Sequence, residues 1–325
     1  MLEEIKEKLD IVEFIKNYVE LKRVGSYYRG LCPFHTEKNP SFYVSPQKQI
    51  FKCFGCNRGG DVITFYMMIE NLEFKEAKQR LAEMLGLDIV KSESGLDTKI
   101  KRLLDINKIA LKFYKQKLKN NQQALDYLQA RGLSEKSIDY FDLGYANLGN
   151  ELRDYLFKLN YNIDELLQAG LLNDKKEDKF QNRIIFPLID HKKRIVGFTG
   201  RLFPERDYGP KYLNSPETPL FKKSSFIYGL VYAQEHILKE KKVVITEGQF
   251  DFLLAFQSGL KNIVAISGSA LTEDQLEILK RYCQKIIFAF DNDEGGLRAL
   301  LRGVFLALKK GFIVEQLNFS TKDLA

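Results

Sequence analysis

Cysteine and histidine, the residues best suited to hold a transition metal, are concentrated in one short window of the sequence. Three of the four cysteines and one of the three histidines lie within residues 32–56, as Cys32-x-x-His35 and Cys53-x-x-Cys56. A gap of two residues lets one tight turn aim both ligands at the same ion. Three thiolates and one imidazole complete a tetrahedron with no open position, so we predict one structural Zn²⁺ that stabilises this segment.

A second set of residues that could do chemistry is acidic. Glu247 follows the apolar run "VVIT", and Asp291 and Asp293 follow "IIFAF". If both runs are parallel strands, their carboxyl ends lie at one edge of a sheet, where three carboxylates can converge on a hard cation such as Mg²⁺. Sites of this kind catalyse phosphoryl or nucleotidyl transfer. The pattern leaves a second interpretation open, in which Asp291 and Asp293 only cap the helix that follows.

Aromatic and cationic residues are interleaved around the metal-type window. The rings are Phe42, Tyr43, Phe51 and Phe54, and the cations are Lys38, Lys48, Lys52 and Arg58. Rings that stack on bases and cations that pair with phosphates suit single-stranded nucleic acid. The alternative use of such rings is packing, and we expect at least half of them to lie inside the folded ribbon.

The chain has 325 residues and a net charge of +7, and its basic excess is confined to the middle. Residues 91–242 hold 28 Lys and Arg against 20 Asp and Glu, whereas residues 1–90 are balanced. This distribution is expected of a segment that touches a polyanion, although a solvated surface can have the same composition. No apolar run approaches the roughly 20 residues that span a bilayer, and the charged N-terminus is no signal peptide. We expect a protein of the reducing cytoplasm with no membrane partner.

Hydrophobic periodicity predicts the elements around the metal-type window. Apolar residues at helical spacing predict a helix over residues 5–19, and alternation within residues 42–53 predicts a hairpin. Two further helices follow, and Asp61 is a good N-cap for the first of them. A polar segment without periodicity, residues 91–98, is expected to be a linker.

The rest of the chain changes character at about residue 243. Before it, a Lys-rich helix over residues 99–119 leads into shorter helices and two strands within residues 183–201, where Pro187 predicts an edge position or a bulge. After it, continuous apolar strands alternate with helices, which is typical of parallel βαβ units with both sheet faces covered. We therefore expect a multidomain chain with an α+β middle and an α/β end.

Several motifs occur in the order found in one protein family. They are "CPFHTEKNPSF" with "CFGC", "FQNRIIFPLIDHKKRIVGFTGR", "PKYLNSPETPLFKK", "EGQFD" and "FDND". In these motifs the chain resembles bacterial replicative DNA primase of the DnaG type over essentially its whole length. The resemblance implies a zinc-ribbon domain with flanking helices at 1–90, a linker at 91–98 and an RNA polymerase domain. That domain would comprise a basic α+β N-terminal subdomain, 99–242, joined to an α/β toprim subdomain with a mostly parallel sheet, 243–325.

The resemblance also implies roles for individual residues. Glu247, Asp291 and Asp293 match the family's toprim acids and are implied as catalytic residues and as ligands of Mg²⁺ or Mn²⁺. Asp251 and Asp323 match further acidic positions that would complete the ligand set. The positions that match residues contacting template or nucleotide are Arg131, Arg201, Lys211, Asn214 and Lys223.

Three positions depart from the family's pattern. Gln249 stands where the family usually has an aromatic or another bulky residue, and Asn292 stands where it often has glycine. Neither change removes a carboxylate. Ala325 stands where a second acid of a later motif is expected, and the family's remaining polymerase helices and helicase-binding domain would follow it. We therefore expect this chain to be a fragment.

The activity that the resemblance implies is synthesis of RNA primers on single-stranded DNA from ribonucleoside triphosphates, at the bacterial replication fork. A replicative helicase would bind through a C-terminal domain that this chain does not contain. Two alternatives stay open: a toprim nuclease, because the same acids serve cleavage, and a non-catalytic, zinc-dependent DNA-binding protein. A type IA topoisomerase would need a nucleophilic tyrosine in another large domain, for which this chain has no room.

Overall fold

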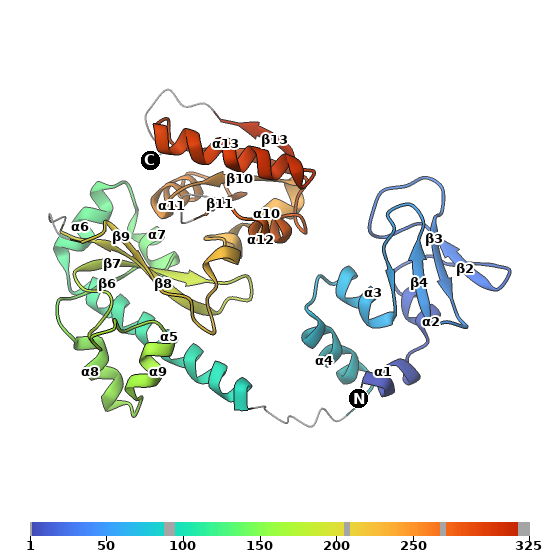
Figure 1. The fold of residues 1–325 in the computed structure, drawn as a ribbon, viewed down its shortest axis with the longest axis horizontal. Coiled ribbons are helices and arrows are strands. Elements are labelled where there is room, and N and C mark those ends of the chain that lie inside the picture. The colour runs from blue at the N-terminus through green and yellow to red at the C-terminus, as the bar shows by residue number, and fades with distance from the viewer. Residues whose placement is uncertain (1, 88–94, 205–208, 267–270, 318–325) are drawn as a thin grey trace. The chain divides into compact units, whose positions relative to one another are not determined.

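The computed structural model describes residues 2–87, 95–204, 209–266 and 271–317. Contacts within the chain divide it into two compact units, Met1–Ser92 and Glu93–Ala325 (Figure 1). No helix within the described ranges is long and apolar enough to cross a membrane. The predicted acid Asp323 and the departure at Ala325 lie outside the described residues.

The first unit is built on a five-stranded antiparallel sheet in the order β1-β2-β3-β4-β5. Its elements are α1 (Leu2–Lys8), α2 (Ile11–Lys16), β1 (Lys22–Val24), β2 (Tyr27–Gly30), β3 (Phe42–Ser45), β4 (Ile50–Cys53), β5 (Gly59–Gly60), α3 (Val62–Ile69) and α4 (Phe74–Met84). The prediction of one helix over residues 5–19 was wrong. Asp10 adopts an extended backbone, and its carboxylate accepts the N–H groups of Val12 and Glu13, so a new helix begins there.

Two local predictions for this unit are confirmed. Strands β3 and β4 form the expected hairpin, with Phe42 opposite Cys53. The Asp61 carboxylate accepts the backbone N–H of Thr64 and caps α3. The core between sheet and helices contains stacked rings, among them Phe42 and Phe51 with centroids 5.3 Å apart. A core this small gains from a metal that closes the loops around it.

The second unit begins with a helical and antiparallel part. Its elements are α5 (Gly95–Lys119), α6 (Gln122–Ala130), α7 (Glu135–Tyr140), β6 (Gly144–Ala146), α8 (Glu151–Lys158), α9 (Ile163–Gln168), β7 (Arg183–Ile189), β8 (Ile195–Leu202), β9 (Tyr212–Asn214) and η1 (Lys223–Ser225). The Lys-rich helix thus begins at Gly95, four residues before the predicted position. Residues 95–98, which lie in the predicted linker, are helical, and the sequence did not indicate this because one helical turn is too short to show a period.

The strands of this part form a sheet in the order β6-β7-β8-β9, all antiparallel. Pro187 pairs with Phe198 of β8, but β6 pairs with β7 only as far as Ile185. Pro187 therefore has an open edge on one side, as its missing N–H requires, and a register shift follows between Leu188 and Ile189. The prediction of an edge position or a bulge is thus confirmed only locally, because β7 as a whole lies between β6 and β8.

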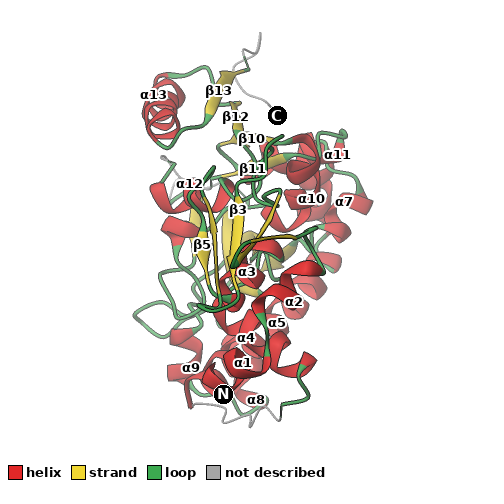
Figure 2. Ribbon diagram, turned by 90° about the vertical axis from the view of Figure 1, so that its right-hand side faces the viewer, coloured by secondary structure: helices red, strands yellow, loops and turns green. Residues whose placement is uncertain are grey.

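The last part of the second unit is a parallel sheet covered by helices (Figure 2). Its elements are α10 (Leu230–Glu240), β10 (Lys242–Thr246), α11 (Gln249–Gln257), β11 (Ile263–Ala265), α12 (Glu273–Leu279), β12 (Lys285–Phe288), α13 (Glu294–Lys309) and β13 (Ile313–Gln316). The strand order is β11-β10-β12-β13 with every pair parallel, which confirms the predicted architecture. Because β10 and β12 are neighbours, the segments that leave their carboxyl ends are brought together.

Candidate functional sites

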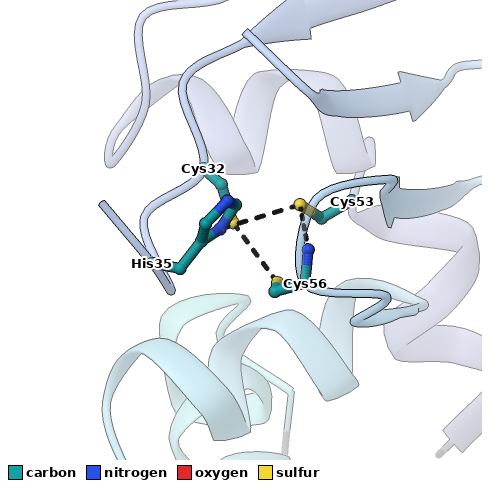
Figure 3. A group of neighbouring side chains, drawn as sticks. All are labelled: Cys32, His35, Cys53 and Cys56. Atoms are coloured by element: carbon teal, nitrogen blue, oxygen red, sulfur yellow. Dashed lines mark hydrogen bonds between the residues drawn. The ribbon is translucent and has the colours of Figure 1, made fainter. Parts of the chain in front are cut away.

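The four predicted zinc ligands come together in the first unit (Figure 3). Cys53 ends β4 and Cys56 lies in the turn after it, while Cys32 and His35 lie in the loop after β2. Their ligand atoms all lie within 4.8 Å of one another, with 3.8 Å between the sulfurs of Cys32 and Cys56. Zn–S bonds of about 2.3 Å at tetrahedral angles place two sulfurs roughly 3.8 Å apart, so the group fits Zn²⁺.

The thiols of this group lie in unequal environments. Burial raises the pKa of Cys32 to about 12. Burial acts in the same direction on Cys53, but hydrogen bonds to its sulfur, first among them that from the backbone N–H of Cys56 at 3.4 Å, lower the pKa of Cys53 to about 6. Zinc binds thiolates, so the Cys32 proton must leave when the metal enters, and zinc affinity falls with falling pH.

Glu37, which the sequence did not single out, contacts two of the zinc ligands, Cys32 and His35. Its carboxylate accepts the backbone N–H groups of Cys32 at 2.8 Å and of Ser41 at 3.0 Å, and also the Ser41 hydroxyl. It lies 3.2 Å from Nε2 of His35, whereas Nδ1 of that ring faces Cys53 at 3.9 Å. A carboxylate on the far nitrogen fixes the ring and leaves Nδ1 for the metal. An acid two residues after a histidine is too common a pattern to single out from the sequence.

The aromatic residues of the ribbon divide into two groups. Phe42 and Phe51 are 0% and 1% exposed and belong to the core, as we expected for at least half of the rings. Phe54 is 72% exposed, and its ring meets that of Tyr43 edge-on at 5.5 Å. Lys52 lies opposite Tyr43 in the β3–β4 ladder. Tyr43 and Phe54 are therefore the rings of this group that a base could reach.

The predicted acids gather at the carboxyl edge of the parallel sheet. Glu247 directly follows β10, and one of its carboxylate oxygens accepts the backbone N–H of Asp291 at 3.1 Å. Gly296, in the first turn of α13, approaches both residues closely. A Cβ atom at Gly296 would lie 2.2 Å from the Asp291 carbonyl oxygen and 2.9 Å from the Glu247 carboxylate. Glycine is thus required for α13 to begin this close to the acids.

The charge state of Glu247 is set by this crowding. Burial raises the pKa of Glu247, and the charges of Asp291, Asp293 and Asp251 raise it further, while the hydrogen bond from Asp291 opposes them. A half-buried carboxylate beside three others is unfavourable as an anion unless a cation neutralises it. Carboxylate oxygens are the ligands that Mg²⁺ and Mn²⁺ prefer, so these residues fit a hard divalent cation.

Two of these acids also bind backbone groups. Asp293 caps α13, because one carboxylate oxygen accepts the Gly296 N–H at 2.8 Å, so the capping interpretation applies to Asp293. Asp251 accepts the N–H of Gly248 at 2.9 Å. Among the residues that the structure describes, only the Cys/His group brings three or more possible ligand atoms close enough together to hold a metal ion without rearrangement. The acids at the sheet edge are neighbours but not such a set.

Two arginines that were predicted to contact template or nucleotide, and that are far apart in the sequence, meet at one ring. The guanidinium carbons of Arg131 and Arg201 lie 4.9 and 5.2 Å from the ring centroid of Phe250, the second residue of α11. Arg201 is 4% exposed and donates to the Tyr212 hydroxyl at 2.9 Å. Both cations therefore lie against the helix that begins just after Glu247.

Two other predicted residues, Asn214 and Lys223, line one small cavity together with Thr199. The Thr199 hydroxyl donates to the Asn214 side-chain oxygen at 2.7 Å. The side-chain nitrogen of Gln249 lies 3.5 Å from the Thr199 oxygen. Gln249, one of the three departures from the family's pattern, thus reaches Thr199 in β8, directly opposite Asn214 in β9.

Lys211 is exposed, and the backbone beside it is held by Arg183, another residue that sequence reasoning missed. Arg183 is 5% exposed, and its guanidinium donates to the carbonyls of Gly200 at 3.0 Å, Pro210 at 3.0 Å and Lys211 at 3.4 Å. Burial lowers its pKa. Arg183 is the first residue of an apolar strand, and nothing in the sequence indicated that its side chain would be buried.

Three family models match the chain in succession. They are a CHC2 zinc finger over residues 1–96, the N-terminal domain of the DNA primase catalytic core over residues 113–234, and a Toprim-like domain over residues 244–325. The DNA primase of Clostridium acetobutylicum is 40% identical over 323 residues, which cover 97% of this chain and 54% of that protein. The chain spans about half the length of the curated relatives it matches.

Solved structures resemble the chain as well. The Aquifex aeolicus primase, with its zinc binding and RNA polymerase domains, matches with a TM-score of 0.65 and 36% identity, over 99% of this chain and 80% of that one. A DnaG primase catalytic domain bound to single-stranded DNA matches with a TM-score of 0.62 and 30% identity, over 70% of this chain and 74% of that one. The likeness thus extends over both units.

Proposed function

The chain belongs to the DnaG family of DNA primases, and from this membership we propose that it synthesises RNA primers on single-stranded DNA. Its substrates are ribonucleoside triphosphates. A 3′-hydroxyl attacks the α-phosphorus of the next nucleotide, the bond to the β-phosphate breaks, and pyrophosphate leaves. The observation that carries the proposal is the Glu247 carboxylate, half-buried at the carboxyl edge of the parallel sheet and hydrogen-bonded to the Asp291 N–H.

We assign Glu247, Asp291 and Asp293 as the ligands of catalytic Mg²⁺ or Mn²⁺, with Asp251 and Asp323 as further acids. The bound metal would neutralise charge on the reacting phosphate and favour ionisation of the attacking hydroxyl. The Asp291 N–H holds Glu247 in place, and the raised pKa of Glu247 gives this carboxylate a strong preference for a cation.

The basic residues bind the polyanionic substrates in this proposal. Arg131 and Arg201 lie against the helix that follows Glu247, which supports a role in holding template or nucleotide near the acids. Asn214 and Lys223 are assigned to the same role from the family's pattern. Lys211 contributes an exposed cation on the same part of the chain. Binding through phosphates predicts an affinity that falls steeply with salt.

The first unit is proposed to carry one structural Zn²⁺ at Cys32, His35, Cys53 and Cys56. With the metal in place, Tyr43 and Phe54 stack on template bases and bias where synthesis starts. A related catalytic domain has been solved with single-stranded DNA, which supports that template class here. The thiolates that zinc needs favour a reducing cytoplasm, and the family resemblance adds a replicative helicase as partner.

The test is template-dependent RNA synthesis with labelled ribonucleotides, single-stranded DNA and Mg²⁺, using the longest available form of the protein. We expect Glu247→Gln to lower the rate by at least ~100-fold, because the site loses one anionic ligand. The matched control is Glu240→Gln, an exposed acid just before the amino end of the same strand, which should leave the rate unchanged.

Three results would each contradict the proposal. A Glu247→Gln variant as active as the control would remove the acids from the reaction. Shortened DNA instead of new RNA would indicate the nuclease alternative. Zinc-dependent DNA binding with no metal-dependent product in any variant would indicate a non-catalytic DNA-binding protein.

A further inference from the structure

We propose that Phe250 is a positioning residue, whose ring holds Arg131 and Arg201 together as one cationic site for phosphate groups. The inference rests on the proposed function and deepens it, because it concerns how the substrate-binding cations are arranged. The ring lies in α11, Arg131 caps the end of α6, and Arg201 is in β8, so three separate elements meet at this point.

The geometry at the ring is that of a shared cation–π contact. The guanidinium carbons lie 4.9 Å and 5.2 Å from the Phe250 centroid, so they are at most about 10 Å apart. Two like charges this close repel each other. The negative face of an aromatic ring attracts both cations, and this attraction offsets part of the repulsion between them.

The two arginines differ in what they can touch. Arg201 is 4% exposed and is surrounded by rings: its guanidinium carbon lies 5.6 Å from the Tyr127 centroid and 5.4 Å from the Tyr212 centroid. Arg131 is only partly buried. Of the two, Arg131 is therefore the one that can contact a phosphate, and Arg201 contributes positive potential from its buried position.

The position of Phe250 in the chain gives the contact a functional meaning. Phe250 is three residues after Glu247, in the first turn of the helix that leaves the acidic edge. Fixing the arginines to this turn fixes their distance from the reacting groups. The anion they bind carries phosphate groups, either of the incoming triphosphate or of the template backbone.

A merely structural role is the alternative, since Phe250 is 3% exposed and also packs on Phe186 at 5.4 Å. Phe252 is the matched control: it lies in the same helix, is 0% exposed, and packs on Phe141 and Tyr228. Among the described residues no arginine lies over its ring. Replacing either phenylalanine disturbs the core, but only the replacement of Phe250 removes the ring that both arginines contact.

The experiment compares Phe250→Met with Phe252→Met, and adds pentafluorophenylalanine at each position, which keeps the ring's shape and reverses its electrostatic face. The readouts are kcat and the nucleotide KM in primer synthesis, and the Kd for single-stranded DNA measured without divalent metal at two salt concentrations. We expect both changes at Phe250 to raise KM or Kd roughly 3- to 10-fold with kcat within about twofold. The changes at Phe252 should lower Tm alone.

The two binding readouts separate the sources of phosphate. A rise in the nucleotide KM alone assigns the site to the triphosphate, and a rise in Kd alone assigns it to the template. If the fluorinated ring at Phe250 changes neither constant, or acts like the one at Phe252, the inference is overturned. Wild-type protein that makes no RNA refutes the proposed function instead, and the Kd measurement still decides the role of Phe250.

Discussion

Replacing Gly296 with alanine perturbs the acidic edge without removing a carboxylate. The added Cβ would lie 2.2 Å from the Asp291 carbonyl oxygen and 2.9 Å from the Glu247 carboxylate. The first distance is roughly 1 Å inside van der Waals contact, and a backbone atom cannot move away alone. Either α13 or the chain at Asp291 must therefore shift by about 1 Å, which disturbs the Asp291 N–H bond to Glu247. Displacements of about 1 Å in an active site can cost on the order of 100-fold in rate.

The neighbouring Gly295 supplies a matched control in the same helical turn. A Cβ there would meet only the Asp293 carboxylate oxygen, at 3.2 Å, which can give by a few tenths of an ångström. Alanine is favoured over glycine in a helix by up to about 1 kcal/mol. Gly295→Ala should therefore keep activity and leave stability equal or slightly higher. Gly296→Ala should lose about 1–3 kcal/mol, because overpacking exceeds the gain in helix propensity.

The assay is template-dependent RNA synthesis by the two variants, with urea unfolding measured beside it. We expect Gly296→Ala to fold, bind DNA and lose about 100-fold in kcat. If Gly296→Ala matched Gly295→Ala in both kcat and stability, the close approach of α13 to the acids would have no role in the reaction. A loss of DNA binding would mean that the substitution acts on the fold and not on the acids.

Two further predictions concern other parts of the chain. Glu37→Gln should weaken zinc binding roughly 10- to 100-fold, measured in competition with a chromophoric chelator, because His35 loses its carboxylate partner. The control is Glu20→Gln, a change at an exposed acid, which should leave the zinc affinity unchanged. Equal zinc affinities of the two variants would contradict the role of Glu37. Asp178 has its pKa raised from 3.8 to about 6 by burial, although two backbone N–H groups at 2.9 Å oppose this. Asp178 therefore binds a proton more tightly in the folded state than in the unfolded state. Its contribution to the free energy of unfolding is largest below pH 4 and falls by about 3 kcal/mol as the pH rises past 6. Urea melts of wild type and Asp178→Asn should show a difference that changes across this window, and a constant difference would contradict it.

The parts of the fold that depend on local spacing could be predicted from the sequence. Two-residue gaps fix which cysteines and histidine can share one ion, and continuous apolar runs separated by helices require a parallel sheet. The meeting of Glu247 with the Asp291 segment followed from strand adjacency. The break at Asp10 was missed because helical spacing continues across it, and only the capping geometry shows that a new helix begins.

Contacts between distant segments could not be predicted in the same way. Glu37 acts through the direction of the His35 ring, which spacing does not reveal. Phe250 has the sequence pattern of an ordinary core residue, and its two arginine neighbours come from a helix end and a strand in the preceding part of the chain. The burial of Arg183 likewise depends on hydrogen bonds to three backbone carbonyls that lie 17 or more residues further along the chain.

The proposed reaction depends on a catalytic metal bound at the sheet edge beside Glu247. The most direct measurement is anomalous X-ray scattering from crystals soaked in Mn²⁺, for the wild type and for Glu247→Gln. We expect a manganese peak beside Glu247 and Asp291 in the wild type and its loss in the variant. Zinc should be retained in both proteins at Cys32, His35, Cys53 and Cys56. Manganese bound equally in both proteins, or bound only away from this edge, would contradict this assignment.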